Sequence, residues 1–358
     1  MKYNALKIFG LATALVWLFQ IPAIASSGHG EEEGDKFNPT EMIMHHISDS
    51  HEFHLWGEGD ESVSVPLPII LYTDNNGLDV FMSSEFHHGQ SPVTRGENTY
   101  IMNHDKIYLA NAEGALDFDE DHHATNAQPM DFSITKNVFS MLLSVLILIL
   151  LFIPVAGKYK KGRMVPKGVQ SFMEPLVLFV RDEIALPNIG KSKYERFTPF
   201  LLTIFFFIWI NNMLGLIPIF PGSANLTGNI AFTMVMAAIT MLVTNFSGNK
   251  HYWGHIFNTP GVPWWLAPIM VPVELIGVLA KPFALMVRLF ANITAGHIII
   301  LSLISLIFVF KSLGVAPVSV AFVLFMNVLE LLVAFLQAFI FTLLSALFIG
   351  SAVAEEHH

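Results

Sequence analysis

A long apolar run, residues 268–310, carries a permanent positive charge near its centre at Arg288. The only other full charges in this run are Glu274 and Lys281. A helix needs only ~20 residues to cross the ~30 Å hydrocarbon layer, so this run predicts a membrane helix that tilts strongly or lies partly in the membrane plane. An Arg at the centre of a membrane helix costs roughly 2.5–3.5 kcal/mol on insertion scales, so Arg288 is predicted to serve a function that needs its charge.

The composition places the chain among multispanning membrane proteins. Its 358 residues are 53% hydrophobic and 13% charged, and there is no Cys, which excludes disulfides, thiolate metal sites and thiol nucleophiles. The charge is uneven: residues 26–136 contain 21 Asp/Glu and 4 Lys/Arg, whereas residues 137–358 contain 8 and 13. This asymmetry predicts an acidic, water-exposed region joined to a membrane domain with basic loops.

Residues 1–25 have the pattern of a cleaved secretory signal peptide. Lys2 and Lys7 precede an apolar stretch at residues 8–21, and small residues follow. The alternative is an uncleaved first membrane helix, but this apolar core is short for a span. Cleavage near Ala25 would leave the following region on the exported side of the membrane.

Residues 26–136 are predicted to form a small exported domain that contains strands. Apolar pieces alternate with turn signals at residues 74–77 and 95–96. Nine of the histidines in this region raise the question of a metal site, but none combines ligand spacing with a clear helix or hairpin, so solvated surface histidines are favoured and no metal is assigned. These are His45, His46, His51, His54, His87, His88, His104, His122 and His123.

Residues 137–358 are predicted to form an all-α membrane domain with about five crossings and one interfacial helix. The predicted crossings are residues 138–155, 200–220, 229–246, 268–310 and 317–352. Basic residues follow the first, precede the second and follow the third, so the positive-inside rule places those ends in the cytoplasm. The mature N-terminus is then periplasmic and the C-terminus cytoplasmic. No internal repeat is visible, which counts against an inverted-repeat transporter.

The interfacial helix is predicted at residues 169–184. Its apolar residues recur at helical spacing, opposite a polar side that includes Glu174 and Arg181. Such a stripe describes a helix that lies in the membrane interface or packs against a partner.

The last two predicted helices each carry a line of polar residues. Glu274, Lys281 and Arg288 are seven residues apart and Asn292 follows four later, so these four share one helix face. The final helix has a matching line, formed by Asn327, Glu330, Ala334 and Gln337. The two lines are therefore expected to face each other across the helix pair.

Full charges in a membrane helix are seldom structural, so Arg288 and Glu330 are assigned a function. The other residues keep a second interpretation: Asn292 and Gln337 could form interhelical hydrogen bonds, and Lys281 could reach toward the membrane surface. An arginine, a carboxylate and a histidine, His297, suit the movement of protons better than the binding of an organic substrate. The chain contains no phosphate-binding loop, nucleophile elbow or H-E-x-x-H motif, so it is not expected to be an enzyme by itself.

Several short segments resemble subunit a of the rotary F-type ATP synthase. They are residues 288–292 (RLFAN) with Ala295 and Gly296, residues 336–341 (LQAFIF), residues 212–218 (NMLGLIP), residues 272–274 (PVE), and Lys281 with Pro282. Together these motifs are specific, and the resemblance covers residues 137–356. The acidic region 26–136 departs from the short N-terminal segment that is usual in this family.

The resemblance implies that Arg288 faces a rotating ring of c subunits. It also implies two aqueous half-channels, which would be lined by Glu274, Asn292, His297, Glu330 and Gln337, with Lys281 and Asn212 as secondary candidates. In the familiar enterobacterial pattern Glu follows the Ala-Gly pair and His precedes the Gln by seven residues, so His297 and Glu330 look exchanged. The implied partners are the c ring, b-type peripheral stalk subunits and the lipid of a bacterial inner membrane, with no cofactor and no nucleic acid.

Two other classes of protein remain open from the sequence. A standalone ion channel or secondary transporter would move ions without a partner. A scaffold would use its polar residues only to hold helices together, and their removal would change stability but not ion flux.

Overall fold

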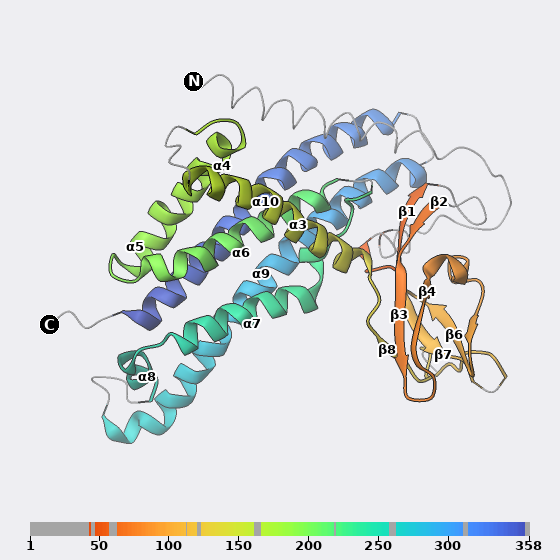
Figure 1. Cartoon of the computed structure of the whole chain (residues 1–358), viewed down its shortest axis with the longest axis horizontal. Coiled ribbons are helices and arrows are strands. Elements are labelled where there is room, and N and C mark those ends of the chain that lie inside the picture. Colours follow the sequence, from red (N-terminus) through yellow and green to blue (C-terminus); the bar gives the residue numbers. More distant parts are fainter. Residues whose placement is uncertain are drawn as a thin grey trace. The chain divides into compact units, whose positions relative to one another are not determined.

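The computed structural model describes residue 43 and residues 47–56, 63–111, 113–119, 123–160, 166–217, 220–257, 263–310 and 314–354. The predicted signal peptide, three of the histidines (His45, His46 and His122) and the residues after 354 lie outside this part of the chain. Contacts divide the chain into two compact units (Figure 1). The first contains Met1–Leu142 and Ile217–Ala224, and the second contains Leu143–Leu216 and Asn225–His358.

The first unit contains antiparallel β-sheets, which confirms the predicted strand-containing region (Figure 1). The strands are β1 (Glu52–Trp56), β2 (Val63–Pro66), β3 (Pro68–Thr73), β4 (Gly77–Met82), β5 (Val93–Arg95), β6 (Asn98–Asn103), β7 (Lys106–Leu109) and β8 (Met130–Asp131). They pair in the orders β1-β2, β4-β3-β8 and β5-β6-β7. The β3–β4 and β5–β6 turns lie at the two predicted turn signals, where Gly77 and Gly96 adopt positive φ angles of 75° and 55°.

The core of the first unit contains side chains from β3, β4, β6 and β7. Ile69, Leu71 and Tyr100 are fully buried, and Phe81 and Phe86 pack edge to face beside them. Burial raises the pKa of the Tyr100 hydroxyl, and its hydrogen bond to the Asp79 carboxylate raises it further.

The remaining elements are helical. They are α3 (Lys136–Lys160), α4 (Val169–Phe179), the π-helical segment η4 (Val180–Ala185), α5 (Leu186–Ile189), α6 (Tyr194–Gly215), α7 (Ile230–Phe246), α8 (Lys250–Phe257), α9 (Ala267–Phe310) and α10 (Ala316–Val353). In the described part of the chain, α3, α6, α9 and α10 are each long and apolar enough to cross a membrane. The predicted crossing at residues 229–246 corresponds to α7, which has 17 residues and meets α8 at a bend of 102°; the pair counts as a fifth span only if it is one broken helix.

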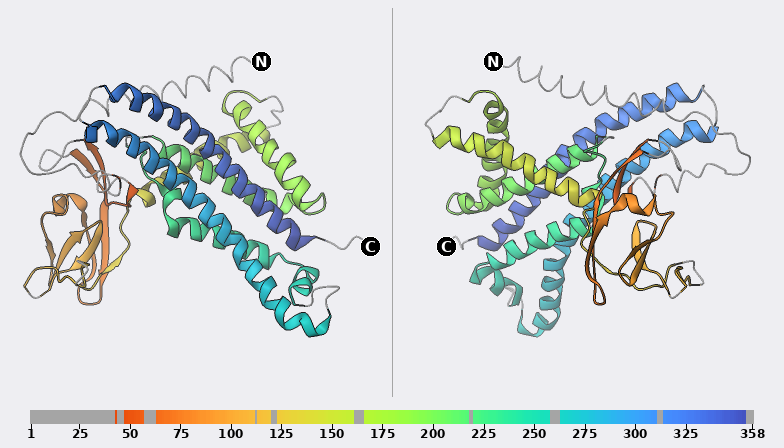
Figure 2. Two further views of the ribbon diagram at one scale, coloured as in Figure 1. Left: turned by 180° about the vertical axis from the view of Figure 1, so that it is seen from behind. Right: turned by 45° about the vertical axis from the view of Figure 1, so that its right-hand side comes forward.

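The two longest helices, α9 and α10, run beside each other (Figure 2). Their bounds agree with the two long apolar runs of the sequence to within one residue at each end. The 44 residues of α9 correspond to a helix about 66 Å long.

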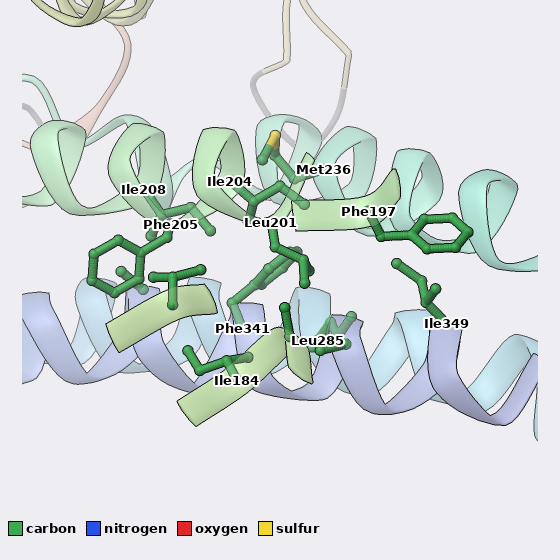
Figure 3. Close-up of a cluster of buried hydrophobic side chains, with 14 of the residues drawn as sticks. Ile184, Phe197, Leu201, Ile204, Phe205, Ile208, Met236, Leu285, Phe341 and Ile349 are labelled. Atoms are coloured by element: carbon green, nitrogen blue, oxygen red, sulfur yellow. The ribbon is translucent and has the colours of Figure 1, made fainter. Parts of the chain in front are cut away.

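The predicted interfacial helix packs against the body of its own chain. Its residues form α4 and η4, and Val180 and Ile184 of η4 are fully buried in the main core. Figure 3 shows Ile184 in this core close to Phe341 of α10 and Leu285 of α9. The C-terminal part of the apolar stripe is therefore a buried face within this subunit, whereas Val169 and Phe172 at its start are 50% and 48% exposed. The interfacial placement of this helix stays a prediction.

The core of the helical unit lies between α6, η4, α9 and α10. Leu201, Phe205 and Ile208 of α6 contribute fully buried side chains (Figure 3). Gly350 of α10 allows a very close helix contact, because a Cβ atom there would lie 1.9 Å from the backbone oxygen of Asn188 in α5. The packing around α10 thus fixes the helix that carries Glu330 and Gln337.

Candidate functional site

Three helices carry the polar residues that the sequence singled out. Helix α9 carries Glu274, Lys281, Arg288, Asn292 and His297, helix α10 carries Glu330 and Gln337, and helix α6 carries Asn212. The structure separates the α9 residues into an exposed group and a group that meets other helices.

Arg288 lies on an exposed face of α9. Asn292, one helical turn further on, is also exposed, and the small side chains of Ala291 and Ala295 lie on the same face. Among the described residues no carboxylate forms an ion pair with Arg288. The guanidinium is therefore available to an acidic group of a neighbouring molecule.

His297 and Glu330 form the central polar pair of the α9–α10 interface. The His297 Nε2 atom lies 3.8 Å from the Glu330 Oε1 atom. The Glu330 side chain is only 4% exposed, and neither carboxylate oxygen has a hydrogen-bond partner among the described residues. A buried carboxylate without such partners is costly in its charged form, so this pair suits the uptake and release of a proton.

A glycine creates the space for this pair. A Cβ atom at Gly296 would lie 2.8 Å from the Glu330 Oε1 atom, closer than real Cβ contacts. Gln337 is buried on the same face of α10 as Glu330, with the buried Ala334 between them. Position 296 therefore needs a residue without a side chain for the Glu330 carboxylate to sit where it does.

The expectation that the two polar lines face each other is wrong for Arg288 and Asn292. His297 follows Arg288 by nine residues, which is two and a half helical turns, so the two side chains point to opposite sides of α9. His297 points toward α10 and Arg288 points away from it.

Glu274 and Lys281 have different neighbours. The Glu274 Oε1 atom lies 3.9 Å from the Nδ1 atom of His255 in α8, which the sequence had not singled out. The Lys281 ammonium lies 5.6 Å from the ring centroid of Phe348 in α10, a cation–π distance. Glu274 thus lies beside His255 of α8, whereas Lys281 contacts Phe348 of α10.

The sequence analysis did not predict a small pocket that lies beside Lys281. The pocket is partly open to the surface, and its polar lining includes Thr240, Thr244, Asn245 and Tyr252. The signal was present in the sequence, because threonines at positions 233, 240 and 244 are seven and four residues apart and share one face of α7.

Asn212 has a structural environment. Its side-chain nitrogen donates a hydrogen bond to the Ala334 carbonyl oxygen at 3.1 Å, and its oxygen accepts one from the Thr227 hydroxyl at 2.6 Å. Asn212 is buried, and these bonds join α6 to α10 and to the loop before α7. This secondary candidate therefore positions the helix that carries Glu330.

The prediction of solvated histidines in the exported region is wrong for His51. This side chain is 3% exposed, and its Nε2 atom lies 3.2 Å from the Asp131 carboxylate. Burial raises the pKa of Asp131, but hydrogen bonds from His51 and Ser133 lower it more, so the pKa lies below its ordinary value. Among the described residues, no group of three His, Asp or Glu side chains could hold a metal ion.

The comparisons with known proteins identify the family to which the chain belongs. Residues 138–350 match the family described as ATP synthase A chain, and residues 42–132 match a domain of unknown function, DUF8433. The chain is 54% identical to ATP synthase subunit a of Chloroherpeton thalassium over 235 residues, which cover 64% of this chain and 69% of the relative. It is 48% identical to ATP synthase subunit a of Myxococcus xanthus over 64% of this chain and 76% of the relative. The subunit of an Anaeromyxobacter species is 39% identical over 93% of this chain and 74% of the relative.

Proposed function

Because the chain belongs to the ATP synthase A chain family, we propose that it is the proton-translocating membrane subunit of a bacterial rotary ATP synthase. It is then a multi-pass protein of the inner membrane that does not itself catalyse ATP synthesis. Its partners are the ring of c subunits, the b-type peripheral stalk and the lipid bilayer. In this proposal residues 1–25 are removed as a signal peptide, residues 26–136 are periplasmic, and residues 137–358 form the membrane domain with a cytoplasmic C-terminus.

In the proposed mechanism Arg288 separates two proton half-channels. A proton enters one half-channel, neutralises a carboxylate of the ring, travels with the rotating ring and leaves by the other half-channel. Arg288 favours the ionised ring carboxylate, and it prevents a direct leak because a guanidinium does not release its proton. The observation that carries this proposal is the exposed Arg288 without an ion-pair partner among the described residues.

The remaining residues would line the half-channels. His297 and Glu330 meet at the α9–α10 interface, and Gln337 is buried on the same face of α10 as Glu330. Asn292 is exposed, and Glu274 lies beside His255 of α8. A membrane potential supplies about 2.3 kcal/mol per charge per 100 mV, so several protons are needed for one ATP.

The test is the substitution Arg288→Ala in the assembled ATP synthase, reconstituted in vesicles. Proton-driven ATP synthesis should be abolished while the complex remains assembled. Arg181→Ala is the matched control, because Arg181 is an exposed arginine that pairs with the adjacent Asp182. Normal proton-driven synthesis by the Arg288→Ala complex would falsify the assignment.

The alternative function is a standalone channel or secondary transporter. The purified chain would then conduct protons when reconstituted alone, which the proposed stator role does not predict. Glu330→Gln tests the scaffold alternative, since a scaffold residue would change the stability of the complex and leave proton flux unchanged.

A further inference from the structure

The outer face of the β4-β3-β8 sheet is uncharged, and Tyr72 carries its only polar side-chain group among the described residues. Successive residues of a strand point to opposite sides, and one side of this sheet buries Ile69, Leu71 and Phe81 in the core. The strand register pairs Pro68 with Met82, Ile70 with Val80, and Tyr72 with both Leu78 and Met130 on the other side. Phe132 and Ile134 continue this outer side, because their backbone amides donate to Ile70 and Pro68. The outer sheet face thus consists of Pro68, Ile70, Tyr72, Leu78, Val80, Met82, Met130, Phe132 and Ile134.

This outer sheet face is open in the described structure. Leu78, Val80 and Phe132 are 62%, 58% and 64% exposed. Its nine residues include no charged side chain, although residues 26–136 contain 21 acidic and 4 basic residues. A contiguous exposed apolar surface on a domain of this kind marks an interaction site.

The chain connects this face directly to a membrane-spanning helix. Phe132 precedes Lys136, where α3 begins, by four residues, and an extended chain of that length reaches at most about 14 Å. The first turn of α3 belongs to the same compact unit as the sheet. Lys136 and Asn137 donate backbone hydrogen bonds to the Ser50 carbonyl oxygen and the Asp49 carboxylate, at 3.0 and 3.1 Å. The chain therefore keeps the Phe132 end of this face within about 14 Å of the start of α3.

We propose that the outer sheet face docks on the lipid surface at the end of α3 that begins with Lys136. Anionic lipid headgroups repel the acidic side chains of this domain. The outer sheet face has no charged side chain and is repelled least, so the domain is expected to turn this face toward the bilayer. Tyr72 and Phe132 supply aromatic rings of the kind that lie at the boundary between headgroups and acyl chains. The proposal rests on α3 crossing the membrane and does not depend on the proton-translocation role.

The experiment uses the absence of cysteine in the chain. Val80→Cys and Leu78→Cys each receive a nitroxide label in the assembled complex, in nanodiscs of equal parts phosphatidylcholine and phosphatidylglycerol. Thr94→Cys on β5 is the matched control, because Thr94 resembles Val in size and is exposed on a strand of the β5-β6-β7 sheet. The collision rates of each label with oxygen and with a water-soluble nickel complex are measured by electron paramagnetic resonance.

A lipid contact predicts an oxygen-to-nickel ratio at positions 78 and 80 that exceeds the ratio at position 94 severalfold. Equal ratios at the three positions would place the face in water and overturn the proposal. Low collision rates with both reagents at positions 78 and 80 would mean that a protein neighbour covers the face, which also overturns it. Both labels replace exposed side chains, so the fold is retained, and the two positions give independent readings.

Discussion

The close approach of Glu330 to Gly296 predicts that Gly296→Ala slows proton translocation without unfolding the α9–α10 pair. An alanine Cβ would lie 2.8 Å from the carboxylate oxygen, so the carboxylate must move by about 0.6 Å to reach ordinary van der Waals contact. The obstructing atom is the end of a flexible side chain, so Glu330 moves and the backbone does not. This movement changes the 3.8 Å approach to His297.

The expected size of the effect follows from side-chain strain. An off-rotamer glutamate costs about 0.5–1.5 kcal/mol, which corresponds to a two- to tenfold slower step if the strain is relieved only outside the proton relay. Replacing glycine by alanine within a helix contributes about 1 kcal/mol in the opposite direction, so overall stability changes little.

The assay compares ATP-driven proton pumping and the melting temperature of the complex for two variants. Gly277→Ala is the matched control, since it lies on the same helix and an added Cβ there meets no described atom within 4 Å. The control should pump normally and melt at an equal or higher temperature. Wild-type pumping by Gly296→Ala, or an equal loss in both variants, would refute the reasoning about Glu330.

Three further predictions concern stability. Gly350→Ala places a Cβ 1.9 Å from the Asn188 backbone oxygen, and a backbone atom cannot rotate away as a side chain can. The free energy of unfolding should fall by about 1–3 kcal/mol, so the melting temperature should lie well below that of Gly277→Ala. An unchanged melting temperature would contradict this contact. Asn212→Leu leaves the buried Ala334 carbonyl and the buried Thr227 hydroxyl without their hydrogen-bond partner. The free energy of unfolding, measured by chemical denaturation of the complex, should fall by about 1–3 kcal/mol. An unchanged value would mean that these hydrogen bonds do not contribute to stability. The pKa of Asp131 is lowered in the folded state, so its stabilising effect is complete above the ordinary value of 3.8 and is lost as the pH falls below it. The protection of the β8 amides against hydrogen exchange, expressed relative to the intrinsic exchange rate at each pH, should therefore fall in acid. Asp131→Asn should remove this dependence, and an acid response that persists in the variant would argue against the His51 contact as its cause.

The long helices could be predicted from the sequence because apolar runs of this length are typical of membrane helices. The bounds of α9 and α10 follow from length and hydropathy alone, and the turn at Gly77 follows from local chemistry. Sheet order, the bend between α7 and α8, and the burial of His51 depend on contacts between distant segments, which periodicity does not encode.

The candidate site was predicted as a set of residues but not as an arrangement. The sequence identified Arg288, His297 and Glu330, and the expectation of facing polar lines followed from the seven-residue spacing of Glu274, Lys281 and Arg288. That spacing is correct for one face of α9, but His297 follows Arg288 by nine positions, which already places His297 on the other side. The helical period alone therefore predicts that Arg288 and His297 lie on opposite sides of α9.

Helix α9 therefore stands between the two groups that the proposed mechanism must connect. A proton held by the His297–Glu330 pair lies on the α10 side, whereas a ring carboxylate attracted by Arg288 would lie on the exposed side. A packed helix offers no transferable proton along its backbone, because its amides are engaged in intrahelical hydrogen bonds. Ala295 and Gly296, which lie beside both groups, have the smallest side chains of this part of α9. Within the proposal, these small residues would let water and protons pass around the helix between its α10 side and its exposed side.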